Sequence, residues 1–201
     1  MPRGDRSPRV AHAASTRQRL VDAALELFGS NGYEATTTSE IAAAAGVSQR
    51  TFFRYFPTKQ AVLFFGEDDF VRSFAGVFLS VPEVSDEVEA MAQAFVVLAP
   101  GVARLKGRIA LYRQAIASSP VLLGHERRNH ERNAEVLAQS VARRRGIALP
   151  DDSCRLLAAV GLLVMDLATT RWLSGRGLRG RTGSLVEIVE DEFARLRGLF
   201  A

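Results

Sequence analysis

The sequence predicts an all-α protein. Apolar residues recur at three- and four-residue intervals along most of its 201 residues, and Ser, Thr or Asp residues that can cap a helix precede several of these stretches. Alternating apolar and polar runs bounded by hairpin turns, which indicate half-buried strands, are nearly absent. The composition, 47% hydrophobic and 24% charged, is typical of a folded globular chain.

The N-terminal residues 1–14 contain Pro, Gly and three arginines but no apolar block. We therefore expect a disordered basic tail rather than a secretory signal, and a cytoplasmic protein. The first helix is expected over 16–29, because Ser15 and Gln18 have the spacing of a capping box and the apolar residues that follow share one face. Gly29 would end it.

Two short helices are expected within residues 37–56. Thr37 is followed three residues later by a glutamate, which makes a second capping box. Gly46 suits a turn with positive φ, and a further helix starts at Ser48 and must end before Pro57. Two short helices joined by a glycine turn describe a helix-turn-helix; the alternative is a pair of ordinary core helices.

Residue types in the second of these helices favour contact with DNA. Its first turn carries Gln49, Arg50 and Thr51, whose amide, guanidinium and methyl-plus-hydroxyl groups suit adenine, guanine and thymine edges. Phe52 and Phe56 lie four residues apart on one face and are expected in the core. The first 60 residues hold eight basic and five acidic side chains, and the remaining 141 hold 18 and 17, so the basic excess lies at the N-terminal end.

The stretch ALELFGSNGYEATTTSEIAAAAGVSQRTFFRYFPTKQAVL resembles the N-terminal pattern of the tetracycline-repressor (TetR) family over about forty consecutive residues. The match includes a Gly-Tyr link, a Thr-rich cap, an Ala-Gly-Val turn and a Phe-Pro-Thr-Lys ending. The resemblance implies a three-helix DNA-binding domain, a fourth connecting helix, and a C-terminal helical domain for ligand binding and dimerisation. We place the domains at 15–60 and 61–201.

The resemblance also implies which residues contact DNA. Members of the family often have Tyr at the position of Phe53, so we expect Phe53 to make only apolar contact and Arg54 to supply the missing phosphate contact. The expected DNA-binding set is Thr37, Thr38, Ser39, Gln49, Arg50, Thr51, Phe53, Arg54, Tyr55 and Lys59.

Beyond residue 57 the sequence predicts six more helices, with a break at Pro100–Gly101. The last two have broad apolar faces, and small residues such as Gly161 would let helices approach closely. Two such helices from each subunit would form a four-helix bundle across a two-fold axis, the alternative being a single core within one subunit. The expected ranges are about 58–78, 86–98, 102–118, 120–145, 153–174 and 184–200.

A ligand pocket is expected among these helices. Asp166 interrupts an apolar stretch, and an acid there needs a partner. That partner would be an arginine such as Arg113 or Arg171, or a polar atom of a ligand. The candidate ligand-binding residues are Tyr112, Gln114, Asp166, Thr169, Thr170 and Trp172.

Several other classes of function are not supported by the sequence. No nucleophile elbow or phosphate-binding glycine loop occurs, and no paired carboxylates stand in a recognisable catalytic setting, so we expect no enzyme and no cofactor. His125 and His130 lie five residues apart and would point away from each other on a helix, and the single Cys154 provides no multi-cysteine metal site. The longest apolar run, residues 156–165, is too short to cross a bilayer.

These observations predict a sequence-specific transcriptional regulator. We expect a homodimer that binds a palindromic operator in double-stranded DNA and is released as a repressor by a small, lipophilic effector. The alternative is a constitutive regulator, or an activator, that has no ligand.

Overall fold

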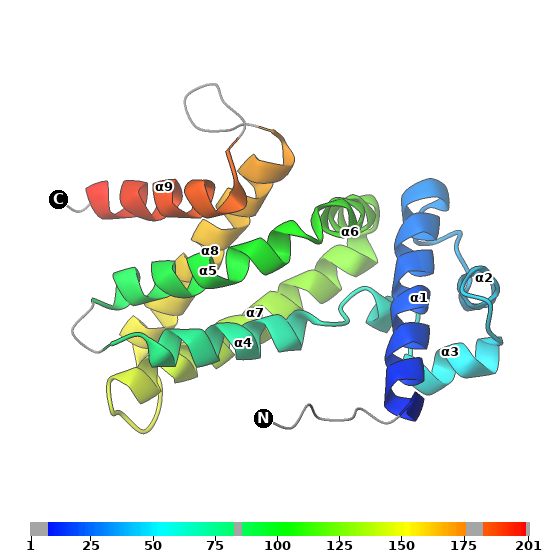
Figure 1. Ribbon diagram of the computed structural model, residues 1–201, viewed down its shortest axis with the longest axis horizontal. Helices are drawn as coiled ribbons and strands as arrows, with labels where there is room; N and C mark the ends of the chain where they lie inside the picture. Colours follow the sequence, from blue (N-terminus) through cyan, green and yellow to red (C-terminus); the bar gives the residue numbers. More distant parts are fainter. Residues whose placement is uncertain (1–7, 83–85, 176–182, 200–201) are drawn as a thin grey trace. The chain divides into compact units, whose positions relative to one another are not determined.

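The computed structural model describes residues 8–82, 86–175 and 183–199, and within these ranges the chain forms nine α-helices, one 3-10 helix and no strand (Figure 1). The prediction of an all-α protein is confirmed. The chain divides into two compact units, of which unit 1 comprises residues 1–65 and 107–126 and unit 2 the remainder. This division differs from the single boundary predicted at residue 60, because residues 107–126 pack with the N-terminal helices.

Unit 1 is built on a long first helix, with α2 and α3 on the same side of it in Figure 1. Leu20, Ala24 and Phe28 of this helix form one buried cluster with Ile41 and Phe52. Their regular spacing explains why a helix forms, since each apolar side chain faces the same core. The helices of unit 1 are α1 (Pro8–Asn31), α2 (Thr38–Ala44), α3 (Gln49–Tyr55), η1 (Gln60–Val62) and α6 (Lys106–Ser118), together with the beginning of α7 (Pro120–Arg144).

The start of α1 differs from the prediction. α1 begins at Pro8, so the expectation of a tail through residue 14 was wrong for residues 8–14, and residues 1–7 lie outside the described part of the chain. Proline is well suited to a first helical position because the N–H it lacks would have no partner there. Ser15 is therefore inside the helix and not its cap.

The helix predicted over 58–78 is interrupted. η1 covers only Gln60–Val62, and α4 begins at Glu67. Between them Gly66 has a φ of 96°, a left-handed conformation that no right-handed helix can include and that favours glycine. The conformation of Gly66 therefore causes the break. The helical spacing of the flanking apolar residues did not predict it.

Unit 2 is a helical domain with an aromatic core. The rings of Phe74 and Phe95 lie 4.3 Å apart between centroids, and Phe95 lies 6.0 Å from Phe193. α9 packs against α5, beside which it lies in Figure 1, and against α8. The helices of this unit are α4 (Glu67–Ser80), α5 (Glu87–Ala103), the rest of α7, α8 (Asp152–Leu173) and α9 (Leu185–Gly198).

The break predicted at Pro100–Gly101 does not occur, because α5 continues through both residues to Ala103. A proline inside a helix removes one backbone hydrogen bond and costs about 3 kcal/mol. Phe95 and Ala99, on the preceding turns, are fully buried in the core of unit 2. Tertiary packing therefore holds the helix together across a residue that would end it in isolation.

α8 is a long, apolar helix of 22 residues. By length and composition alone it would qualify as a membrane span. However, Ala158, Met165 and Ala168 are buried in the core of unit 2, and Arg171 donates hydrogen bonds to Asp191 (2.6 Å) and Glu192 (2.8 Å) of α9. Packing within unit 2 thus accounts for much of the apolar character of α8.

The N-terminus of α8 is capped by Asp151. Its carboxylate accepts hydrogen bonds from the Cys154 backbone N–H (2.8 Å) and the Ser153 hydroxyl (2.8 Å), and Arg145 lies 3.5 Å away. These contacts, the backbone bond first, hold the pKa of Asp151 at about 2, below its ordinary value of 3.8. Because the pKa is lowered in the folded state, the cap stabilises fully above the ordinary pKa and is lost as the pH falls toward 2.

We therefore predict that Asp151→Asn makes stability less dependent on pH in the acid range. Asparagine also caps helices but does not titrate, so the variant should lose less stability than the wild type between about pH 5 and pH 2. Urea unfolding at each pH measures the effect. Parallel pH profiles for the two proteins would contradict the assignment.

Candidate nucleic-acid interface

The turn between α2 and α3 is fixed by local hydrogen bonds. The Thr37 hydroxyl accepts from the Glu40 N–H at 3.2 Å while the Glu40 carboxylate accepts from the Thr37 N–H at 2.7 Å, which confirms the predicted capping box. The Thr37 N–H, and after it the Thr37 hydroxyl at 2.8 Å, donate to the Glu40 carboxylate and lower its pKa. Gly46 has a φ of 68°, as predicted for the turn, and the Ser48 hydroxyl caps α3 by accepting from the Thr51 N–H at 3.2 Å.

The two faces of α3 differ sharply in chemistry. Phe52 and Phe56 are buried in the core of unit 1, so the prediction that they are core residues is confirmed. Arg50 and Arg54 are exposed on the opposite side of the helix, and Gln49 is exposed at its first turn. Phe53 lies among them and is 49% exposed, an unusual position for a phenylalanine. The exposed face thus offers amide and guanidinium donors together with one apolar ring.

The first turn of α3 is tied to α2 through Gln49. Its amide nitrogen donates to the Thr38 hydroxyl oxygen at 2.8 Å. This bond leaves the carbonyl oxygen and one N–H of the Gln49 amide available to an outside partner. Gln49 and Thr38, which were predicted as separate DNA contacts, are therefore positioned by each other.

Thr51 and Ser39 occupy different settings. The Thr51 hydroxyl lies 3.0 Å from the Ser48 hydroxyl and is half-buried, so it belongs partly to the cap of α3. Ser39 is exposed in the first turn of α2, next to the exposed Thr37. Only the outward side of Thr51 is accessible to a ligand, whereas Thr37 and Ser39 are open to solvent.

Lys59 has a structural role that sequence reasoning missed. Its ammonium donates to the backbone carbonyls of Tyr33 (2.6 Å) and Thr36 (2.8 Å) and lies 4.1 Å from the centre of the Tyr33 ring. Lys59 therefore fixes the loop that connects α1 to α2. One ammonium N–H remains for the phosphate contact that was predicted for this residue.

α6 is joined to α1 by polar contacts spread along its length. Arg108 lies 3.1 Å from Asp22, Gln114 donates to the Gly29 carbonyl at 3.2 Å, and Ser119, just beyond α6, donates to Glu34 at 2.7 Å. These contacts explain why residues 107–126 belong to unit 1. They join positions about 85 residues apart, which no local sequence pattern indicates.

The predicted ligand-binding residues lie in both units. In unit 1, Tyr112 packs edge-on against Phe64, and the Gln114 amide is engaged by α1. In unit 2, the Thr169 hydroxyl is buried and donates to the Met165 carbonyl, while Trp172 is buried beneath the Lys106 ammonium, 4.8 Å from its ring centre.

Asp166 and Thr170 are both exposed on α8. Asp166 is thus not the buried acid that the apolar sequence around it suggested. A ligand-binding role for the six residues stays a prediction.

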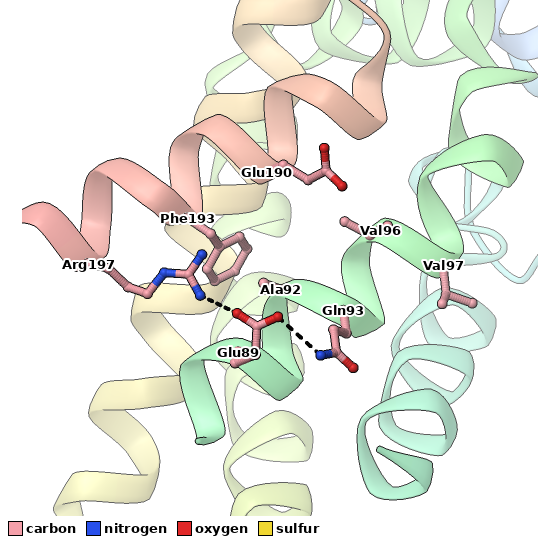
Figure 2. Close-up of a pocket in the computed structure, with 8 residues that line it drawn as sticks. All are labelled: Glu89, Ala92, Gln93, Val96, Val97, Glu190, Phe193 and Arg197. Atoms are coloured by element: carbon pink, nitrogen blue, oxygen red, sulfur yellow. Dashed lines mark hydrogen bonds and ion pairs between the residues drawn. The ribbon is translucent and has the colours of Figure 1, made fainter. Parts of the chain in front are cut away.

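Unit 2 contains a small cleft between α5 and α9, with a volume of about 270 Å³ (Figure 2). Phe193 and Ala92 form its buried base, and Val96 and Val97 line the side formed by α5. Glu89 is held at the rim by the Gln93 amide and by Arg197. The pKa of Glu89 is lowered by these two hydrogen bonds, that of Gln93 first.

The charge-rich part of α7 does not form a metal site in the described residues, where no group of three potential ligands comes together. His125 lies over Phe64 instead, with 6.2 Å between ring centres.

The described structure is thus an all-α protein with an N-terminal helix-turn-helix whose second helix exposes polar and cationic side chains. Residues 20–64 match the family model of the bacterial regulatory proteins of the tetR family. Residues 86–201 match the family model of the MftR C-terminal domain. The chain belongs to the TetR family of transcriptional regulators. Proteins of this family are soluble, bind DNA operators and small-molecule ligands, and are not enzymes.

Individual relatives agree with this assignment. The chain is 33% identical to the transcriptional regulator TcmR of Streptomyces glaucescens over 165 residues, which cover 78% of this chain and 73% of TcmR. It is 27% identical to the regulator MftR of Mycobacterium tuberculosis over 184 residues, or 90% and 88% of the two chains. The fold resembles that of the fatty acid degradation regulator FadR of Bacillus halodurans, with a TM-score of 0.64 and 20% identity over 96% of this chain and 97% of that one.

We predict that Lys59→Met lowers the free energy of unfolding by about 2 kcal/mol, because two backbone carbonyls lose a charged donor. Guanidinium denaturation measures the loss. Lys106→Met is a matched control that removes the same charge but only a contact with the Trp172 ring, for which about 0.5–1 kcal/mol is expected. Equal effects of the two substitutions would mean that Lys59 does not hold the loop.

Proposed function

We propose that the protein is a homodimeric repressor that binds a palindromic operator through α3 and is released by a small molecule. The exposed first turn of α3 is the observation that carries the proposal. In a regulator of this family, two such helices on one dimer would enter successive major grooves about 34 Å apart. Operator binding requires access to the chromosome, so we also propose a cytoplasmic location for this activity.

Base reading is assigned to Gln49, Arg50 and the outward side of Thr51. The free carbonyl oxygen and remaining N–H of Gln49 suffice for the paired contact that an amide makes with adenine, and the bond to Thr38 limits the rotamers available to it. The exposed Arg50 suits guanine. Phe53 would contact a sugar or a thymine methyl group, as its exposure permits.

Phosphate contacts are assigned to the hydroxyl groups and cations at the edges of the motif. They hold the register of the protein on the duplex without reading its sequence. The residues are Thr37, Thr38, Ser39, Arg54, Tyr55 and Lys59.

We predict that Arg50→Ala weakens binding to a specific operator by about 1–3 kcal/mol and relaxes the preference at one base position of each half-site. The operator comes from selection in a random DNA pool, and fluorescence anisotropy measures affinity. Unfolding should be unaffected because Arg50 is exposed. An unchanged binding isotherm would remove Arg50 from the base-reading set.

Dimerisation is assigned to an apolar stripe on α8. Leu156, Leu163 and Leu167 are 66%, 55% and 49% exposed, and their spacing of seven and four residues places them on one face of the helix. The apolar face of α9, by contrast, is buried inside its own unit, where Ile188 and Phe193 belong to the core. In the expected four-helix bundle, the apolar surface between the two subunits would therefore come from α8.

A second copy of the chain is the occupant we assign to this stripe, since operator binding by paired recognition helices needs a two-fold dimer. We predict that Leu163→Asp converts the dimer to a monomer and abolishes tight operator binding, as sedimentation and anisotropy would show. Leu123→Asp makes the same substitution at an equally exposed leucine of α7 and serves as control. A Leu163→Asp variant that stays dimeric would exclude this face.

Release by an effector requires a ligand that prefers the conformer unable to bind DNA. The apolar base of the cleft between α5 and α9 supports a lipophilic compound, as does the ligand-binding character of the family. A thermal-shift screen with lipophilic metabolites, followed by operator release, tests this part. Compounds that bind without releasing DNA, or a flat response, would favour a constitutive regulator.

A further inference from the structure

Arg17 of α1 lies beside α3, and its side chain has no hydrogen-bond or ion-pair partner among the described residues. Its guanidinium carbon is 5.4 Å from the centre of the Tyr55 ring and 5.1 Å from that of Phe65. Among the hydrogen bonds and ion pairs of the described residues, none involves the Arg17 side chain. Aromatic contacts alone therefore hold this cation, and its five N–H donors remain available.

The rings that hold Arg17 are themselves anchored. Phe65 packs edge-on against Phe56 at 5.9 Å, and Phe56 is buried against Phe52 in the core of unit 1. Tyr55 is half-buried at the end of α3. Although Phe65 is 39% exposed, the Arg17 guanidinium is consequently held by rings that pack on the core of unit 1.

A second cation shares the Tyr55 ring. The guanidinium carbon of Arg54 lies 5.1 Å from the same ring centre. Neither Arg54 nor Arg17 forms an ion pair with an acid of the described chain. Two like charges on one ring repel each other, and an anion from outside the described chain would neutralise them while accepting hydrogen bonds from both.

We propose that Arg17, Arg54 and Tyr55 together bind one phosphate group of the DNA backbone, with Arg17 as a contact contributed by α1 from outside the helix-turn-helix. The inference rests on the proposed function, because Tyr55 belongs to the helix assigned to the major groove. Arg17 adds affinity that is independent of sequence, whereas Arg50 adds specificity. Phe65 is a positioning residue, since it holds Arg17 without reaching the DNA.

The test compares Arg17→Gln with wild type on the selected operator and on a scrambled duplex at several salt concentrations. We expect about tenfold weaker binding to both duplexes at low salt, and a salt dependence of log Kd that falls by about 0.9 per contact, or nearly 2 per dimer. Arg143→Gln, which removes an exposed charge from α7 in unit 2, is the matched control and should change neither quantity appreciably.

Phe65→Leu provides the second arm. It should weaken DNA binding in the wild-type background and have no further effect in the Arg17→Gln background, since its role is exerted through Arg17. Additive effects of the two substitutions, or an Arg17→Gln variant that behaves like Arg143→Gln, would overturn the proposal. The proposal would also be overturned if millimolar inorganic phosphate bound at this site while Arg17→Gln left DNA binding unchanged. The site would then bind a free anion and not the DNA backbone.

The outcome is distinguishable from failure of the proposed function. A wild-type protein that binds all duplexes equally would contradict operator recognition by α3. In that case the Arg17-dependent change in salt dependence would still be expected, because the phosphate contact does not depend on sequence.

Discussion

The packing of Phe52 and Phe56 into the core of unit 1 determines the orientation of α3, and the proposed function depends on that orientation. Because α3 has only seven residues, burying these two rings leaves a single free face. Arg50 and Arg54 lie on that face, and Gln49 is exposed beside it at the first turn. A rotation of the helix about its axis would bury charged groups and expose phenylalanine, which is strongly unfavourable. The core thus orients the side chains assigned to DNA.

Polar contacts fix the helix ends and the loop around α3. The capping box of Thr37 fixes the start of α2, and the bond from Gln49 to Thr38 links the two helices of the motif. Lys59 holds the loop between α1 and α2 by donating hydrogen bonds to two of its backbone carbonyls. Each of these bonds is modest by itself, but together they reduce the freedom that DNA binding would have to remove.

Sequence patterns predicted the elements whose causes are local. The capping box at Thr37, the turn at Gly46 and the buried face of α3 all follow from residues within a few positions of one another. The patterns failed where tertiary contacts decide the result. α5 continues through Pro100 because neighbouring residues are buried, and α6 joins unit 1 through contacts distant in sequence. Lys59 was assigned to DNA alone because its carbonyl partners belong to a loop that no periodicity describes.

An alanine scan of α3 in which DNA affinity and unfolding free energy are both measured separates side chains that contact DNA from side chains that hold the helix in place. We expect Gln49→Ala and Arg50→Ala to weaken operator binding while stability stays within about 0.5 kcal/mol of wild type. Phe52→Ala should instead lower stability by about 3–5 kcal/mol. A scan in which the exposed positions leave affinity unchanged, or in which affinity falls only in proportion to stability, would contradict the assignment of this face to DNA.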